Sequence, residues 1–141
     1  MPWRLLLPVY DAAMNAARGA FAERGVQGYV MCHLSHSYHS GACLYFTFAF
    51  RCDPGDDMLA SYDVVKSAIQ QAFVDNGATL SHHHAVGTEH AQWLVQDISA
   101  PGVAMLEALF DGFDPGRNMN PGKIVPEGST VSSGPLAPAG D

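Results

Sequence analysis

Residues 43–50 alternate between large apolar side chains and smaller or polar ones. Successive side chains of a β-strand point to opposite faces, so this alternation predicts a strand with one face in a core. The second face is small and polar except for one phenol, that of Tyr45. We expect a sheet that is packed on one face and lines a binding cleft on the other. The predicted core face holds Leu44, Phe46, Phe48 and Phe50, and the other face holds Cys43, Tyr45, Thr47 and Ala49.

The segments around this strand predict a partner strand and several helices. Residues 29–34 are strand-like and are followed by the turn-forming triplet His39-Ser40-Gly41, so we expect an antiparallel hairpin with a long connection. The Ala-rich helix expected at 11–23 needs a closely packed partner. The predicted fold class is therefore α+β, an antiparallel sheet with helices packed on one face. The other expected elements are helices over 58–73, 93–98 and 99–113 and a short strand over 78–81.

Length and charge restrict the function classes. A chain of 141 residues with 48% hydrophobic and 15% charged residues has the composition of one modest globular domain. The net charge is −7 and no basic run exists, which argues against a nucleic-acid partner. The longest aliphatic run, Leu5 to Leu7, is far shorter than the ~20 residues of a membrane helix. We therefore expect no transmembrane segment.

The cysteines favour a reducing compartment. Cys32, Cys43 and Cys52 are odd in number, have strand-like apolar neighbours and show no CxxC spacing. Buried free thiols are the ordinary interpretation of such a pattern. We expect a cytoplasmic protein.

Histidines are the residues that most directly suggest chemistry. They occur as His33-Leu34-Ser35-His36, as His39, as the run 82–84 and as His90. A zinc site is one hypothesis, but neighbouring residues of an extended run point to opposite sides and Glu89 is the only well-spaced carboxylate. The run also precedes Ala85-Val86-Gly87, where the backbone can approach a ligand closely, so the imidazoles could serve an organic cofactor. A polar loop with locally satisfied histidines is the third interpretation, and these residues alone leave the choice open.

Four segments together resemble a known family. They are residues 31–38 (MCHLSHSY), 41–48 (GACLYFTF) and 81–87 (SHHHAVG), and Asp114-Pro115 followed by NPGK at 120–123. The sequence resembles the FAD-linked oxidases of the vanillyl-alcohol-oxidase type, and within them the alkyldihydroxyacetonephosphate (alkylglycerone-phosphate) synthases. The similarity runs from the first predicted helix to Val125.

The resemblance implies a place in a larger enzyme and a set of site residues. Residues 1–126 would be the C-terminal part of the cap domain, a ferredoxin-like half that packs over the flavin ring, and 127–141 a flexible tail. The FAD-binding domain, with its glycine segment for the pyrophosphate, lies outside this sequence. Tyr45 matches the family's proton-transfer tyrosine. The residues His82, His83 and His84 match its active-site loop, and Asn120 matches an asparagine near the flavin.

The implied activity is an exchange in ether-lipid synthesis. The acyl chain of acyl-dihydroxyacetone phosphate is replaced by a fatty alcohol, without net redox change, through a covalent adduct at flavin N5. We expect this activity only together with the FAD-binding half, supplied by a longer polypeptide or by a second chain. A lipid substrate would bring the cytoplasmic protein to a membrane surface. One alternative is an FAD-dependent D-2-hydroxy-acid dehydrogenase with a histidine base. Another is a non-catalytic α+β module that dimerises or binds a small molecule through its open sheet face.

Overall fold

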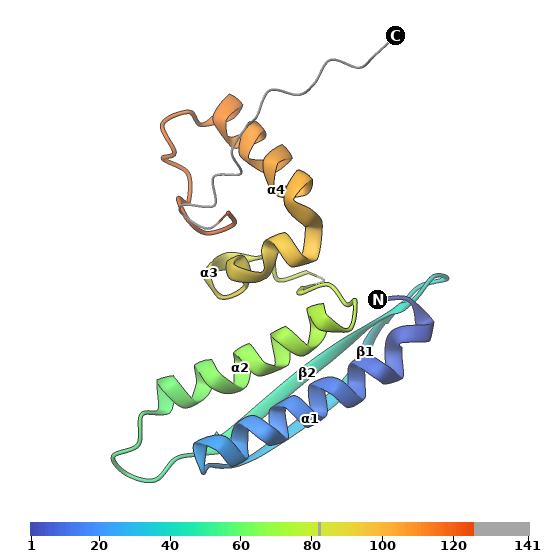
Figure 1. The fold of residues 1–141 in the computed structure, drawn as a ribbon, viewed down its shortest axis with the longest axis vertical. Helices are drawn as coiled ribbons and strands as arrows, with labels where there is room; N and C mark the ends of the chain where they lie inside the picture. Colours follow the sequence, from blue (N-terminus) through green and yellow to red (C-terminus); the bar gives the residue numbers. More distant parts are fainter. Residues whose placement is uncertain (82, 126–141) are drawn as a thin grey trace. The chain divides into compact units, whose positions relative to one another are not determined.

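The aromatic strand predicted at residues 43–50 is one half of an antiparallel hairpin (Figure 1). The computed structural model describes residues 1–81 and 83–125, which fall into two units that divide after His84. Each unit is described by itself. In the first, a short 3-10 turn (Trp3–Leu5) leads into helix α1 (Leu6–Arg24), strands β1 (Gln27–Ser37) and β2 (Ala42–Arg51), and helix α2 (Met58–Asp75).

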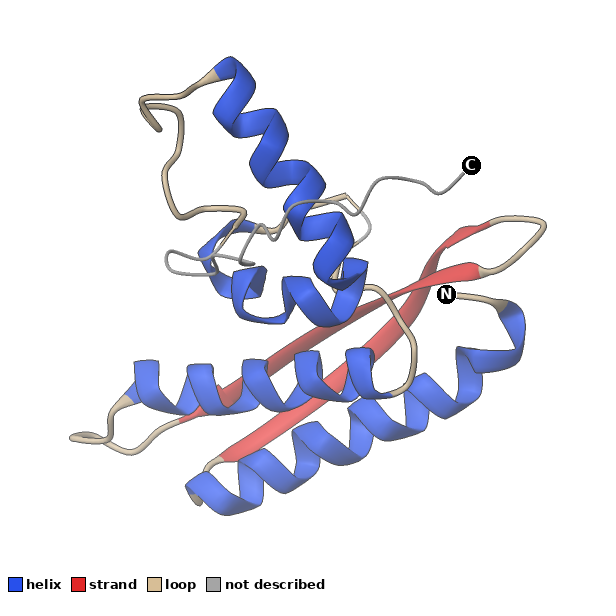
Figure 2. Ribbon diagram, turned by 45° about the horizontal axis from the view of Figure 1, so that its top comes forward, coloured by secondary structure: helices blue, strands red, loops and turns tan. Residues whose placement is uncertain are grey.

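Both helices of this unit cover the same face of the hairpin, as the ribbon shows (Figure 2). Three alanines of α1, Ala13, Ala17 and Ala20, are at most 4% exposed and pack with Val65 and Ile69 of α2. Small side chains let the two helix backbones approach closely, which confirms the expected close partner. The inward residues of the hairpin complete this core. They are Val30, Phe46, Phe48 and Phe50.

The α+β class and the facing of β2 are therefore as predicted, but the connection between the strands is short. The strands extend beyond the predicted ones, so only residues 38–41 join them. Tyr38 N–H donates to the Gly41 carbonyl at 2.8 Å, and Gly41 N–H donates back at 3.4 Å. A Cβ on Gly41 would lie 1.9 Å from the Met1 carbonyl oxygen, so only glycine allows the N-terminal segment to approach.

The N-terminal residues fasten the tip of the hairpin. The Met1 ammonium donates to the Ala42 carbonyl at 3.1 Å, and Ala42 N–H donates to the Met1 carbonyl at 3.0 Å. The Trp3 indole N–H is shared between the carbonyls of Tyr38 and His39. These long-range hydrogen bonds hold the connection of the hairpin against the start of α1.

The strand predicted over residues 78–81 is wrong for the described residues, which pair only β1 with β2. Ala78 and Leu80 are buried and Thr79 is exposed, so the alternation that suggested a strand is present. However, Gly77 (φ +73°) turns the chain after α2, and Ala78 N–H donates to the Phe73 carbonyl. The alternation of residues 78–80 therefore reflects which side chains are buried, and the segment pairs with no described strand.

The second unit is helical. It contains α3 (Gly87–His90), a 3-10 turn (Ala91–Trp93) and α4 (Leu94–Phe113). The sequence did not predict α3. Ser99 has non-helical backbone angles (φ +69°, ψ 162°) inside α4, which agrees with the predicted break between two helical segments at this residue. Within the described ranges no helix is long and apolar enough to cross a membrane, and the predicted tail, 127–141, lies outside them.

The start of α2 depends on one side-chain cap. Asp57 Oδ1 accepts a hydrogen bond from Ala60 N–H at 2.9 Å. We expect Asp57→Ala to lower the free energy of unfolding by about 1 kcal/mol, measured by urea denaturation, because an N-terminal amide loses its acceptor. Asp57→Asn should retain most of the stability. Asp63→Ala, at an exposed position inside the same helix, is the matched control, and an equal loss there would contradict the capping role.

Candidate functional site

The sheet face opposite the helices carries Tyr45 beside a histidine. In the strand register His33 of β1 lies directly across from Tyr45 of β2. Their ring centroids are 5.2 Å apart and the planes differ by 27°, which is a stacked arrangement. Tyr29 and Met31, on the same face of β1, are 59% and 50% exposed. The phenol therefore stands on the open face of the sheet, as the alternation predicted.

A β-bulge brings a second histidine of β1 to this face. Leu34 pairs with Leu44, but the next pair is His36 with Cys43, so Ser35 is an extra residue in β1. In a regular strand, residues three apart point to opposite faces. The bulge shifts this alternation by one, and His36 joins His33 on the open face. The Ser35 hydroxyl lies 2.9 Å from His36 Nδ1.

The segment after α2 adds two imidazoles to the same place. The His83 ring lies 6.4 Å from Tyr45 and 5.8 Å from His36. The His84 ring lies 5.8 Å from Tyr45, edge-on, and 4.1 Å from His83. The His84 N–H donates to the Ser81 hydroxyl at 3.1 Å. We call His33, His36, Tyr45, His83 and His84 the imidazole cluster.

The structure thus brings together three of the five residues chosen from sequence, Tyr45, His83 and His84. His82 lies outside the described residues. His33 and His36 were among the histidines considered from sequence, but no role was predicted for them. No feature of the sequence marks Ser35 as a bulge, so this part of the cluster required the structure.

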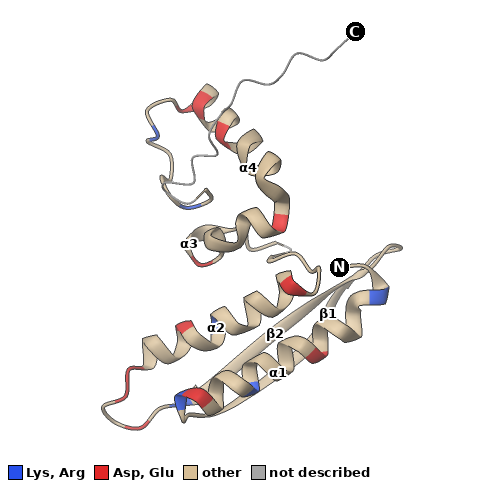
Figure 3. Ribbon diagram, in the orientation of Figure 1, with Lys and Arg blue, Asp and Glu red and all other residues tan. Residues whose placement is uncertain are grey.

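The imidazole cluster offers ring nitrogens and a phenol hydroxyl as hydrogen-bond donors and acceptors. The hairpin carries no acidic side chain and only Arg51 as a basic one (Figure 3). Among the residues described, no group of three His, Cys, Asp or Glu side chains could hold a metal ion. Stacked phenol and imidazole rings can transfer protons and can contact a planar ring, which are the functions of an acid–base site around an organic group.

Cys32 is not suited to nucleophilic chemistry. None of the three thiols, all in the described part, forms a disulfide. Burial, with a smaller contribution from Cys43, raises the pKa of the Cys32 thiol to about 11. Because the thiolate is the reactive form, Cys32 stays protonated and unreactive at neutral pH, as a structural thiol does.

Asn120 belongs to the second unit, where it lies in a loop of two turns after α4. Asp114 organises the first turn: its Oδ2 accepts from Met119 N–H at 2.6 Å, and its carbonyl accepts from Arg117 N–H at 2.8 Å. Asn120 has φ +48°, which asparagine tolerates, and its carbonyl accepts from Lys123 N–H at 3.3 Å. The side chain of Asn120 is exposed.

This loop should keep its anchor to a lower pH than an ordinary aspartate would allow. Hydrogen bonds from the backbone amides of Met119 and then Asn118 hold the pKa of Asp114 below its ordinary value of 3.8. The charged form is favoured in the folded loop, so its contribution is present above pH 3.8 and is lost as pH falls through the lower folded value. We expect the Met119 amide resonance to shift with a midpoint below pH 3.8, followed by NMR. A midpoint at or above 3.8, or an unchanged profile in Asp114→Asn, would contradict this.

Comparison with known proteins places the chain in a family. Residues 6–124 match the model of the FAD linked oxidases, C-terminal domain. An alkyldihydroxyacetonephosphate synthase of Dictyostelium discoideum is 34% identical over 75% of this chain and 17% of its own length. The synthase of Trypanosoma brucei brucei is 32% identical over 91% of this chain and 21% of its own. An uncharacterized FAD-linked oxidoreductase of Escherichia coli, YgcU, is 27% identical over 88% of this chain and 26% of its own.

The regions aligned with the two synthases span only about a fifth of each synthase. The family match, over residues 6–124, includes Tyr45 and the segment with His83 and His84. The match to the family model covers both units of the described structure. The chain belongs to the family of FAD-linked oxidase C-terminal domains.

Proposed function

We propose that this chain supplies the substrate-facing part of an FAD-dependent enzyme similar to the alkyldihydroxyacetonephosphate synthases. The observation that supports this most is the imidazole cluster, in which Tyr45 stacks on His33 and lies within 6.4 Å of the His83 and His84 rings. The reaction would be the exchange of the acyl chain of acyl-dihydroxyacetone phosphate for a fatty alcohol. The synthases named above support this choice of substrate.

In this proposal Tyr45 is the catalytic residue: as the phenolate it takes a proton from the substrate, and as the phenol it returns that proton. Its neighbours accept and donate hydrogen bonds as the phenol changes charge, because an imidazole can do either with little rearrangement. His84, which is edge-on to the phenol, and His83, which lies nearly parallel to it, would contact the substrate, while His33 stacks on the phenol and fixes the plane of its ring. His82 keeps the role that the family resemblance gives it, as part of the same loop.

The described residues fit one end of FAD. The open sheet face offers stacked rings and N–H donors, which suit a flat heteroaromatic ring and its polar edge. The glycine-rich phosphate segment of a dinucleotide site would come from outside this sequence. Bound there, the flavin would act as the electron reservoir for making and breaking bonds at the substrate carbon. Asn120 would contact the flavin from its own loop.

The partner in this proposal is the FAD-binding part of the enzyme, in the same polypeptide or in a second chain. Tyr29 and Met31 leave apolar surface on the sheet face that carries Tyr45. We propose that the FAD-binding part covers this face, which would exclude water from the phenol. A cytoplasmic enzyme working at a membrane surface would meet a lipid substrate there, and a homo-oligomer of this chain is the competing way to cover the same face.

The test reconstitutes the enzyme and separates two reactions. The chain is purified with an FAD-binding half, and isotope-labelled fatty alcohol is supplied with acyl-dihydroxyacetone phosphate. We expect labelled ether product and one free fatty acid for each product formed. Absence of exchange in a preparation that binds FAD and is folded by circular dichroism would overturn the proposal.

A second candidate is a flavin-dependent oxidation of a D-2-hydroxy acid, favoured by the oxidoreductase name of the Escherichia coli relative. Here a histidine of the imidazole cluster would be the base. The same preparation would then reduce an electron-accepting dye with a hydroxy acid and give no exchange. The two outcomes exclude each other as the main activity.

A further inference from the structure

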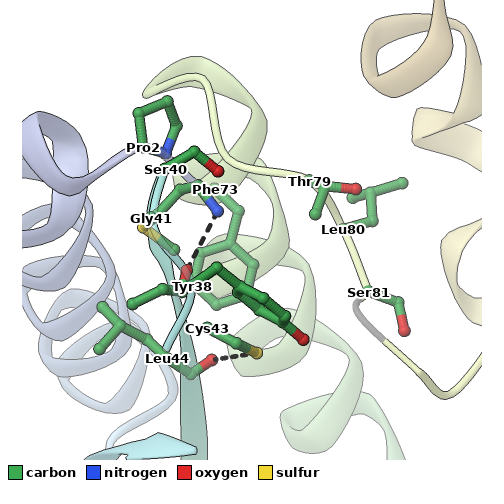
Figure 4. A pocket seen from close by; sticks show the side chains of 12 residues that line it. Pro2, Tyr38, Ser40, Gly41, Cys43, Leu44, Phe73, Thr79, Leu80 and Ser81 are labelled. Carbon is green, nitrogen blue, oxygen red and sulfur yellow. Dashed lines mark hydrogen bonds between the residues drawn. The ribbon is translucent and has the colours of Figure 1, made fainter. Parts of the chain in front are cut away.

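Two cavities lie beside the imidazole cluster, along the outer edge of β2. The first has a volume of about 310 Å³ and is walled by the tip of the hairpin on one side and by the segment after α2 on the other (Figure 4). The second has a volume of about 160 Å³ and reaches from β2 to α2 and the two histidines. Both belong entirely to the first unit of the chain.

The two cavities adjoin, because five residues line both of them. Both are lined by Leu44, Phe73, Leu80, Cys43 and Ser81. In the close-up, Cys43 and Leu44 belong to the hairpin, and Leu80 and Ser81 belong to the segment after α2 across the cavity (Figure 4). A ligand that lies along these shared residues would reach both cavities.

The two ends differ in chemistry. Beyond the shared walls, the first cavity is lined mainly by apolar or backbone surface, from Pro2, Gly41 and the Tyr38 ring. The second is lined by Phe46, Phe48 and Ile69 and by the polar side chains of Lys66, Gln70, Tyr45 and the two histidines, and its described walls include no carboxylate. Lys66 carries the one side-chain ammonium among the described lining residues of the two cavities. The Met1 ammonium lies in the lining of the first cavity, where it donates to the Ala42 carbonyl.

We propose that these adjoining cavities bind one amphiphile, with its hydrocarbon segment in the first cavity and an anionic headgroup against Lys66 in the second. Burial of methylene groups supplies affinity that has no direction. A headgroup placed by an ammonium and by N–H donors supplies direction. The headgroup would then lie next to Tyr45, which is also a wall of the second cavity.

This inference makes Lys66 a specificity-determining residue that family similarity did not assign. The proposed binding deepens the proposed function. It rests on that function only for the identification of the bound amphiphile with the substrate. Binding itself requires neither FAD nor turnover. A failed exchange assay would therefore not contradict the binding of an amphiphile, and a failed binding experiment would not contradict the exchange reaction.

The experiment measures binding of decyl phosphate, decanoate and decanol to the purified chain by calorimetry, below the concentrations at which they form micelles. We expect both anions to bind more tightly than decanol by about tenfold or more, because only the anions form a charge-assisted hydrogen bond with Lys66. Decyl phosphate binding tighter than decanoate would point to a phosphate headgroup, and the reverse order to a carboxylate. Equal affinity for all three, or no binding of any, would overturn the proposal.

Variants assign the two ends separately. Lys66→Met keeps most of the apolar part of the side chain, so it should abolish the tighter binding of the two anions without weakening the binding of decanol. Lys66→Arg keeps the positive charge and should keep the tighter binding of the anions. Lys123→Met, at the other lysine of the chain, is the matched control. Thr79→Trp fills the first cavity from an exposed position and should weaken all three ligands about tenfold or more, while Thr88→Trp should not. If Lys66→Met weakened decanol as strongly as decyl phosphate, the headgroup assignment would be wrong.

Discussion

Replacing Tyr45 with phenylalanine should lower the rate of the proposed exchange reaction by about 10²- to 10⁴-fold and leave FAD binding unchanged. The phenol hydroxyl is the only group removed, and general acid–base catalysis contributes a factor of this size. The stack on His33 at 5.2 Å depends on the ring, which phenylalanine retains. The measurement is the turnover number of the reconstituted enzyme, with flavin absorbance taken on the same sample.

Tyr29→Phe provides the matched control, because Tyr29 lies on the same face of the hairpin, is 59% exposed and opposes Ala49 in the register. It should keep full activity. If Tyr45→Phe also kept full activity, Tyr45 would not be the proton-transfer residue. If the variant lost its flavin as well, the phenol would have a binding role instead.

The largest expected effect on folding comes from the contact between α1 and α2. Ala17 is fully buried there, in the same core cluster as Val65 and Ile69. Replacing Ala17 with leucine inserts three carbon atoms into a close-packed interface, which typically costs about 1–3 kcal/mol. We expect a loss of this size in the free energy of unfolding, measured by urea denaturation with circular dichroism.

Ala22→Leu makes the same chemical change on an exposed part of the same helix and should alter stability by less than about 0.5 kcal/mol. An equal loss in both variants would point to helix propensity and not to packing. No loss in Ala17→Leu would mean that the two helices can separate without cost.

Much of the first unit could be predicted from sequence because its signals are local. The alternation of apolar side chains in β2 set the two faces of the sheet, and the alanines of α1 indicated a close partner. Residues 78–81 show the limit of this reasoning: Ala78 and Leu80 alternate in burial like a strand. Whether a neighbouring strand is available to accept hydrogen bonds is decided by the whole fold.

The candidate site could be predicted only in part, for a similar reason. Family resemblance pointed to Tyr45, His83 and His84, and the structure brings their rings together. His36 joins the imidazole cluster because of the β-bulge at Ser35, which no side chain in the sequence indicates. Lys66 lies in an ordinary amphipathic helix, and its place in a cavity wall depends on how α2 crosses β2.

The bulge at Ser35 also affects how the length of β1 can change in evolution. One extra residue shifts the alternation of β1 between Ser35 and the tip, while the pairs from Gln27 to Leu34 keep theirs. Loss of Ser35 would make the pairing regular and leave His36 opposite Cys43 on the open face, without a new fold or a substitution at Tyr45. Chains of this architecture can therefore shorten β1 by one residue at the bulge and still keep this histidine beside the phenol.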